Sequence, residues 1–194
     1  SPVSEIIVEN KIAKGLKVHD EVIHFDGIIA GADYHHVEQK LLPKEYRRYD
    51  ENYWDKRKLA PSSLLFYVGL SEKVNGLEHH NLFFDESLDQ HGKEIYETPK
   101  WPSKPLFYVC AASKTDDEIS PKGHENLMIL MPVAPDLEDS IENQEKYFEL
   151  IVSRMEKQLG RELKSIIDYK KTFSINDFKS TYNAYKGNAY GLAN

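Results

Sequence analysis

Three uninterrupted apolar runs constrain the fold of this chain more than any other feature. They cover residues 63–70, 107–112 and 127–133, and each is rich in aliphatic, β-branched and aromatic side chains. Short runs of this kind, bounded by polar or Gly/Pro turns, are typical of strands. Because polar residues do not alternate within the runs, we expect a sheet that is covered on both faces. Residues 81–84 are a candidate fourth strand.

The segment before these runs has a different pattern. Residues 3–33 consist of short β-branched stretches separated by polar turns, which predicts a β-meander. Residues 34–42 suit a helix that Pro43 ends, and residues 44–58 suit short helices or a loop over a surface.

The last third of the chain is predicted to be largely helical. Residues 139–159 place apolar side chains three and four positions apart, which gives one stripe, and Gly160 is a suitable C-cap. An extended segment over 163–172 follows, and Ser174 with Asp177 forms a start similar to a capping box. The predicted fold class is therefore α+β, with a mixed or antiparallel sheet of about four to five strands covered by helices.

Composition excludes several classes of function. The chain has 194 residues and a formal net charge of -7, whereas a nucleic-acid partner requires a basic stripe, so we expect none. The single cysteine, Cys110, excludes an internal disulfide and a multi-thiolate metal site, and we interpret it as a small buried hydrophobe. No apolar stretch approaches the ~20 residues that span a bilayer. Because the chain starts at Ser1 without an initiator methionine, we expect both ends to lie inside a longer polypeptide.

No constellation of residues identifies a reaction. The pairs His35-His36 and His79-His80 are adjacent, so their side chains point to different faces of a helix or strand, and we expect no metal site. No acidic pair stands out as an acid/base couple, and the catalytic residues stay unknown. Neither Gly-x-Gly-x-x-Gly nor a Walker-type phosphate loop occurs.

One cluster of small residues, at 183–191, has two interpretations. Gly187 and Gly191 could let the backbone approach a ligand closely, or they could allow tight helix packing. The residues alone therefore establish a soluble α+β domain without an assigned function.

Four stretches of the chain, taken together, are similar to a known family. They cover residues 1–36, 60–84, 106–135 and 183–193. The most specific parts are Ala-Pro-Ser-Ser-Leu-Leu-Phe-Tyr-Val-Gly-Leu from residue 60 and Ser-Pro-Lys-Gly-His-Glu-Asn-Leu from residue 120. In this order they resemble the bacterial and fungal type of phytoene desaturase, in the FAD-dependent carotenoid desaturase family.

The resemblance implies an internal piece of an oxidoreductase that introduces conjugated double bonds into phytoene in carotenoid biosynthesis. The family's Gly-x-Gly-x-x-Gly fingerprint, which places the cofactor pyrophosphate on a helix N-terminus, is missing. The resemblance assigns residues 1–33 to the FAD-binding domain, as its β-meander, and residues 34–194 to the substrate-binding domain. It implies that FAD binds the full-length protein, that this piece alone binds FAD weakly or not at all, and that the piece is inactive alone.

The resemblance also implies roles for particular residues. A long polyene has no polar handle, so apolar and aromatic surface must hold it; one face of the sheet would line the hydrocarbon tunnel and the other would pack on the helix at 139–159. The implied cofactor-binding residues are Val3, Ala32, Asp33, Gly187 and Gly191. The implied substrate-lining residues are Phe66, Tyr67, Phe107, Tyr108 and Tyr190.

Partners follow from the same resemblance. The polyene is dissolved in a membrane, so the full-length enzyme is expected to be cytoplasmic and peripheral to the membrane. The aromatic and cationic segment 46–58 is a candidate membrane contact, with a solvated surface helix as the alternative. Apolar surface exposed on such a piece would favour a homo-oligomer.

Two alternatives stay open. The protein could be another carotenoid desaturase, a carotenoid isomerase or a retinol-saturase-like enzyme, since the shape of the tunnel sets the substrate. It could also be a stand-alone module that binds a hydrophobic ligand without redox chemistry. The sequence does not determine the carotenoid or the number of desaturations.

Overall fold

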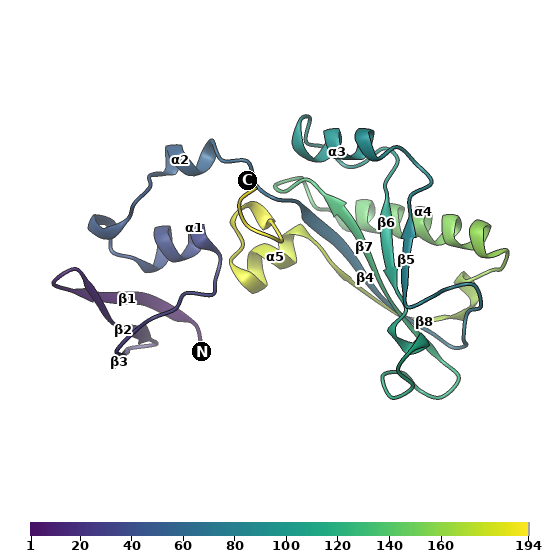
Figure 1. Ribbon diagram of the computed structural model, residues 1–194, viewed down its shortest axis with the longest axis horizontal. Coiled ribbons are helices and arrows are strands. Elements are labelled where there is room, and N and C mark those ends of the chain that lie inside the picture. Colours follow the sequence, from purple (N-terminus) through teal and green to yellow (C-terminus); the bar gives the residue numbers. More distant parts are fainter. Residues whose placement is uncertain (194) are drawn as a thin grey trace.

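Two antiparallel sheets organise the molecule. The computed structural model describes residues 1–193, and Figure 1 shows a small sheet formed by the N-terminal strands beside a larger one. The small sheet has the order β1-β2-β3 and the large sheet the order β5-β6-β7-β4-β8. The strands are β1 (Val3–Glu9), β2 (Ile12–Val18), β3 (Glu21–His24), β4 (Ser62–Leu70), β5 (His80–Phe83), β6 (Phe107–Cys110), β7 (Glu125–Val133) and β8 (Ile167–Phe173).

The small sheet confirms the predicted meander. Asn10 and Lys11 have φ angles of 50° and 64°, so the β1–β2 connection uses left-handed residues, as tight hairpins require. Helix α1 (Tyr34–His36) continues into the π-helical turn η1 (Val37–Leu41). Residues Val37 and Leu41 of this turn are buried against Ile6 of β1, which gives the small sheet a core of its own.

The large sheet is the scaffold of the molecule. Helix α4 (Ile141–Leu159) begins at Ser140, whose hydroxyl accepts a hydrogen bond from the Asn143 N–H at 3.2 Å. It ends at Gly160, whose φ of 66° is the left-handed conformation of a C-cap. The predicted apolar stripe of this helix is confirmed, and its buried residues are Tyr147, Phe148, Ile151, Val152 and Met155.

A second helix on the large sheet was absent from the sequence-based prediction. Helix α3 (Leu88–Tyr96) begins at Ser87, whose hydroxyl accepts from the Gln90 N–H. Its His91 reaches the carbonyl of Pro132 on β7. The expected cover on both faces of the sheet is therefore only partly correct, because α4 covers one face along its length and α3 covers a portion of the other.

The end of the chain returns to the start of the large sheet. Helix α5 (Ile175–Tyr182) is followed by residues 189–193, which run beside residues 58–61. Backbone bonds join Ala60 N–H to Gly191 O at 2.9 Å and Ala189 N–H to Pro61 O at 3.0 Å. The other short helices are η2 (Lys44–Tyr46), α2 (Glu51–Asp55), η3 (Ala112–Lys114), η4 (Lys164–Ile166) and η5 (Tyr185–Gly187).

An aromatic cluster lies between α1 and α2. Trp54 is 1% exposed, and its ring meets those of Tyr34 and Tyr53 edge to face at 5.2 Å and 5.4 Å. The Trp54 ring of the segment 46–58 therefore points into the protein rather than toward solvent. Among residues 1–193, none of the helices combines the length and hydrophobicity that crossing a bilayer requires.

Candidate functional site

The pleat of the large sheet divides its side chains between two different environments. Along β7, every second residue from Glu125 to Val133 is buried and the residues between them are only half-buried. The apolar members of the buried set, from Leu127 to Val133, pack with the stripe of α4 in one continuous core, and we call this side the closed face. The other side carries Met128 and Leu130 and is half-exposed, and we call it the open face.

A groove separates α3 from the open face. It has a volume of about 370 Å³, within the range of small-molecule sites. The lining includes no acid, lysine or arginine. Its residues are Pro61, Leu82, Phe84, Leu88, His91, Gly92, Ile95, Tyr96, Leu106, Phe107, Tyr108, Leu130 and Pro132.

The imidazole of His91 is the main polar group beneath this groove, and its partners are already in place. Its Nε2 lies 2.8 Å from the Pro132 carbonyl, and its Nδ1 accepts from the Leu106 N–H at 3.1 Å. Burial lowers the pKa of His91 below its ordinary value, so the ring is neutral near pH 7. The α3 groove is therefore uncharged and suits an apolar ligand.

A second hollow continues along the open face. Its volume is about 290 Å³, and its lining includes Cys110 and Met128. Tyr108 pairs with Leu130, and Cys110 pairs with Met128 two residues along the strands. Because two residues of a strand span about 7 Å, the two hollows follow one another on the same face.

Because side chains alternate between the two faces of a strand, the predicted substrate-lining residues do not all lie on the same face of the sheet. Phe66 is fully buried on the closed face, where its ring lies 5.0 Å from that of Phe148, and Phe107 is buried too, although it borders the α3 groove. Tyr67 and Tyr108 lie on the open face, in the second hollow and the α3 groove respectively. Tyr190 lies apart from both hollows and is 67% exposed.

Two of the predicted cofactor residues meet between the sheets. Asp33 accepts hydrogen bonds from the His36 N–H and from the Asn188 side chain at 3.2 Å. The Asn188 side chain in turn accepts from the Gly191 N–H. Asp33, Asn188 and Gly191 border a cavity of about 20 Å³, which has room for about one water.

The other predicted cofactor residues lie elsewhere. Val3 packs against the small core around Ile6, and Ala32 is exposed just before α1. Gly187 has a φ of 69°, and a Cβ there would lie 2.5 Å from Cγ2 of Ile175. Tight packing thus explains Gly187, whereas Gly191 has open space where a Cβ would point.

A buried carboxylate, that of Glu125, lies at one end of the closed face. The Glu125 carboxylate is bound by the Lys114 ammonium at 2.7 Å, the Ser113 hydroxyl and the Val74 N–H. Burial alone would raise the pKa of Glu125, but these three donors outweigh it and hold the pKa below the ordinary value. The network joins β7 to η3 and to the loop after β4, which fixes one end of the closed face.

The sequence of this chain is similar to those of several carotenoid desaturases. A carotenoid 3,4-desaturase from Haloarcula japonica is 42% identical over 176 residues, which are 91% of this chain and 36% of that protein. The homologues of this chain are carotenoid desaturases. A phytoene desaturase from Phycomyces blakesleeanus is 30% identical and a zeta-carotene-forming phytoene desaturase from Myxococcus xanthus is 27% identical, each over the whole chain. The resemblance seen in the sequence is confirmed.

The chain spans only part of these relatives, between 34% and 38% of the length of the three proteins named above. No protein-family model matches it. In structure it is similar to an oxidoreductase from Methanosarcina mazei, with a TM-score of 0.57 and 17% identity over 89% of this chain and 36% of that one. The structural likeness supports the α+β fold.

The sequence-based prediction missed α3 and the groove beside it. The signal was present in two forms. Ser87 and Gln90 have the spacing of a helix N-cap, and Leu88, His91 and Ile95 follow at three- and four-residue intervals. The many charged and polar residues between them obscured that pattern.

Proposed function

We propose that this chain supplies the polyene-binding sheet of a carotenoid desaturase, an FAD-dependent enzyme that introduces conjugated double bonds into phytoene or a similar polyene. The observation that carries the proposal is the open face, whose α3 groove is apolar, uncharged and about 370 Å³ in volume. The relatives named for carotenoid reactions support it.

The role proposed for the open face is to hold and desolvate a hydrocarbon. Each 100 Å² of apolar surface removed from water contributes about 2.5 kcal/mol. Leu82 and Phe84 are 64% and 58% exposed, so they have apolar area to give to a ligand. Tyr67 and Tyr108 add aromatic surface at the neighbouring positions, and the neutral His91 adds no charge that the ligand would have to desolvate.

The residues present do not form an FAD site by themselves. The chain contains no Gly-x-Gly-x-x-Gly fingerprint, and the cavity at Asp33 and Gly191 has a volume of about 20 Å³, far below that of a flavin. Binding of FAD by the full-length enzyme is part of the proposal, with Asp33 and Gly191 at the edge of a site that other segments complete. The chain alone is proposed to be inactive.

We also propose that the full-length enzyme contacts a membrane peripherally, because a polyene partitions into lipid. Because the ring of Trp54 is buried, the proposed contact uses the cations and tyrosines of the segment 46–58 rather than its tryptophan. A vesicle co-sedimentation assay with anionic lipids tests it, and the charge-reduced pair Arg48→Gln and Arg57→Gln should release the protein.

The proposed function is tested in the full-length gene product that contains this chain. Leu82→Asp places a carboxylate in the α3 groove at an exposed position, so folding should be preserved. Turnover of phytoene, followed by chromatography of the coloured products, should fall more than about tenfold, because a buried charge opposes hydrocarbon binding.

A matched control separates the groove from general surface effects. Ile12→Asp makes the same change at a position that is 53% exposed on the small sheet, and its turnover should equal that of the parent. Equal activity of Leu82→Asp and the parent would remove the α3 groove from the substrate path. A parent enzyme that leaves phytoene unchanged but converts another carotenoid would reassign the reaction within the family.

A further inference from the structure

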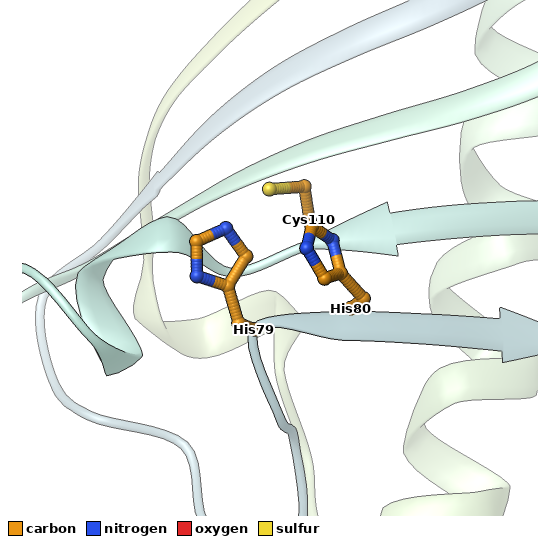
Figure 2. A group of neighbouring side chains, drawn as sticks. All are labelled: His79, His80 and Cys110. Atoms are coloured by element: carbon orange, nitrogen blue, oxygen red, sulfur yellow. The ribbon is translucent and has the colours of Figure 1, made fainter.

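Three side chains with metal-binding chemistry meet at the β5–β6 edge of the large sheet. They are His79, His80 and Cys110, and one ligand atom from each lies within 4.8 Å of the others. Figure 2 shows the two imidazoles and the thiol gathered around one space. The polyene binding proposed above makes no use of the metal-binding chemistry of these three side chains.

The strand pairing explains why adjacent histidines converge here. His80 is the direct cross-strand partner of Cys110, so both side chains project from the same face of the sheet. His79 precedes the first residue of β5, so the alternation of the pleat does not govern its side chain. Its carbonyl accepts from the Ala111 N–H at 2.8 Å, which holds His79 beside the end of β6.

Both rings are oriented by hydroxyl groups. Nδ1 of His79 lies 2.6 Å from the Thr115 hydroxyl, and Nδ1 of His80 lies 2.6 Å from the Tyr108 hydroxyl. Histidines that bind metals usually have such a hydrogen bond on the nitrogen that does not ligate. Among the hydrogen bonds of residues 1–193, none involves Nε2 of either ring, so these nitrogens are available.

We propose that His79, His80 and Cys110 bind one thiophilic transition-metal cation, for which Zn²⁺ is the probe. Two imidazoles and one thiolate are a ligand set that Zn²⁺ accepts, with a water in the fourth position. On binding, the cation loses waters, the Cys110 thiol releases its proton to solvent and the sulfur–metal bond forms. Ligand atoms of tetrahedral zinc lie about 3.3–3.8 Å apart, so side-chain rotation must draw the three groups together by about 1 Å.

The position of the site gives it a structural consequence. His79 and His80 belong to the edge of the sheet at β5, and Cys110 lines the second hollow of the open face. A bound cation therefore fastens the edge strand to β6 beside that hollow. It also occupies the thiol, so that the Cys110 of the loaded protein resists alkylation.

The test is titration of the 194-residue chain with Zn²⁺ by calorimetry and with Co²⁺ by absorption spectroscopy. One equivalent of each should bind, and Co²⁺ should give a thiolate-to-metal charge-transfer band. Cys110→Ser should abolish the band, and His79→Gln or His80→Gln should weaken Zn²⁺ binding more than about tenfold. All three residues are exposed or half-buried, so these variants should fold.

Two further variants sharpen the result. His24→Gln changes an exposed histidine on β3 and should leave the affinity for Zn²⁺ unchanged. Thr115→Val removes the hydroxyl that orients His79 and should weaken binding less than loss of a ligand. The proposal is overturned if the parent chain binds no Zn²⁺, or if stoichiometric binding survives Cys110→Ser with unchanged affinity.

Discussion

The two faces of the large sheet carry similar residues but differ in how far those residues are exposed to solvent. On the closed face, Phe66 and Ile129 are at most 1% exposed beneath α4. One residue further along the same strands, Tyr67 is 41% exposed and Leu130 borders the α3 groove. Hydrophobicity alone therefore does not make these residues core; the apolar stripe of α4 closes one face, while the shorter α3 leaves the other available to a ligand.

The largest effect expected from this comparison is on stability. Phe66→Ala opens a cavity in the closed face and should lower the free energy of unfolding by about 3–5 kcal/mol. Tyr67→Ala, the neighbouring change on the open face, should cost less than about 1 kcal/mol because the ring is partly in water. Urea unfolding of the two variants measures the difference, and equal losses would contradict the assignment of the faces.

A smaller loss is expected at the polar end of the closed face. Glu125→Gln keeps the shape of the side chain but removes the negative charge that pairs with the Lys114 ammonium, so the free energy of unfolding should fall by about 2–3 kcal/mol. The matched control is Glu118→Gln, at an exposed position, which should change little. Equal effects of the two changes would show that the network contributes nothing to stability.

The same carboxylate should make stability depend on acid. Since the pKa of Glu125 in the folded protein is held below its ordinary value of 4.5, its contribution is complete above that value and is lost as the pH falls through the folded pKa. Thermal melting between pH 7 and pH 3 should show a steeper decline for the parent than for Glu125→Gln. Parallel curves would mean that other carboxylates dominate acid unfolding.

The smallest effect on stability is expected on the open face itself. Leu82→Ser should change the free energy of unfolding by less than about 0.5 kcal/mol, because Leu82 is 64% exposed. It should nevertheless reduce the binding of an environment-sensitive apolar dye to the α3 groove, measured by fluorescence. A variant that loses stability without losing dye binding would reverse the roles given to the two faces.

The strands and the long helix could be predicted because each has a local signal. The run 127–133, the stripe from Tyr147 to Met155 and the C-cap at Gly160 are all contained in contiguous sequence. Which face of the sheet stays open was not predictable from the runs, because it depends on the length and placement of α3. Uninterrupted apolar runs suggested cover on both faces, whereas a sheet with one open apolar face produces the same pattern.

The candidate sites show the same limit. The four aromatic residues predicted on the large-sheet strands could not be divided until the strand register was known, since Phe66 and Tyr67 differ by one position. Adjacent residues of one regular strand point to opposite faces, so the pair His79-His80 was not expected to bind one metal ion. Cys110 is distant in sequence, and only the pairing of β5 with β6 brings it beside them.

The antiparallel contact between residues 58–61 and 189–193 has a consequence for how such proteins can be rebuilt. The segments that enter and leave the large-sheet region lie side by side, and the Ala60 N–H donates a hydrogen bond to the Gly191 carbonyl. Everything from 61 to 189 is therefore a cassette with adjacent ends, of the kind that tolerates transplantation. Exchanging this cassette between two carotenoid desaturases should transfer substrate preference while leaving the recipient's remaining framework undisturbed.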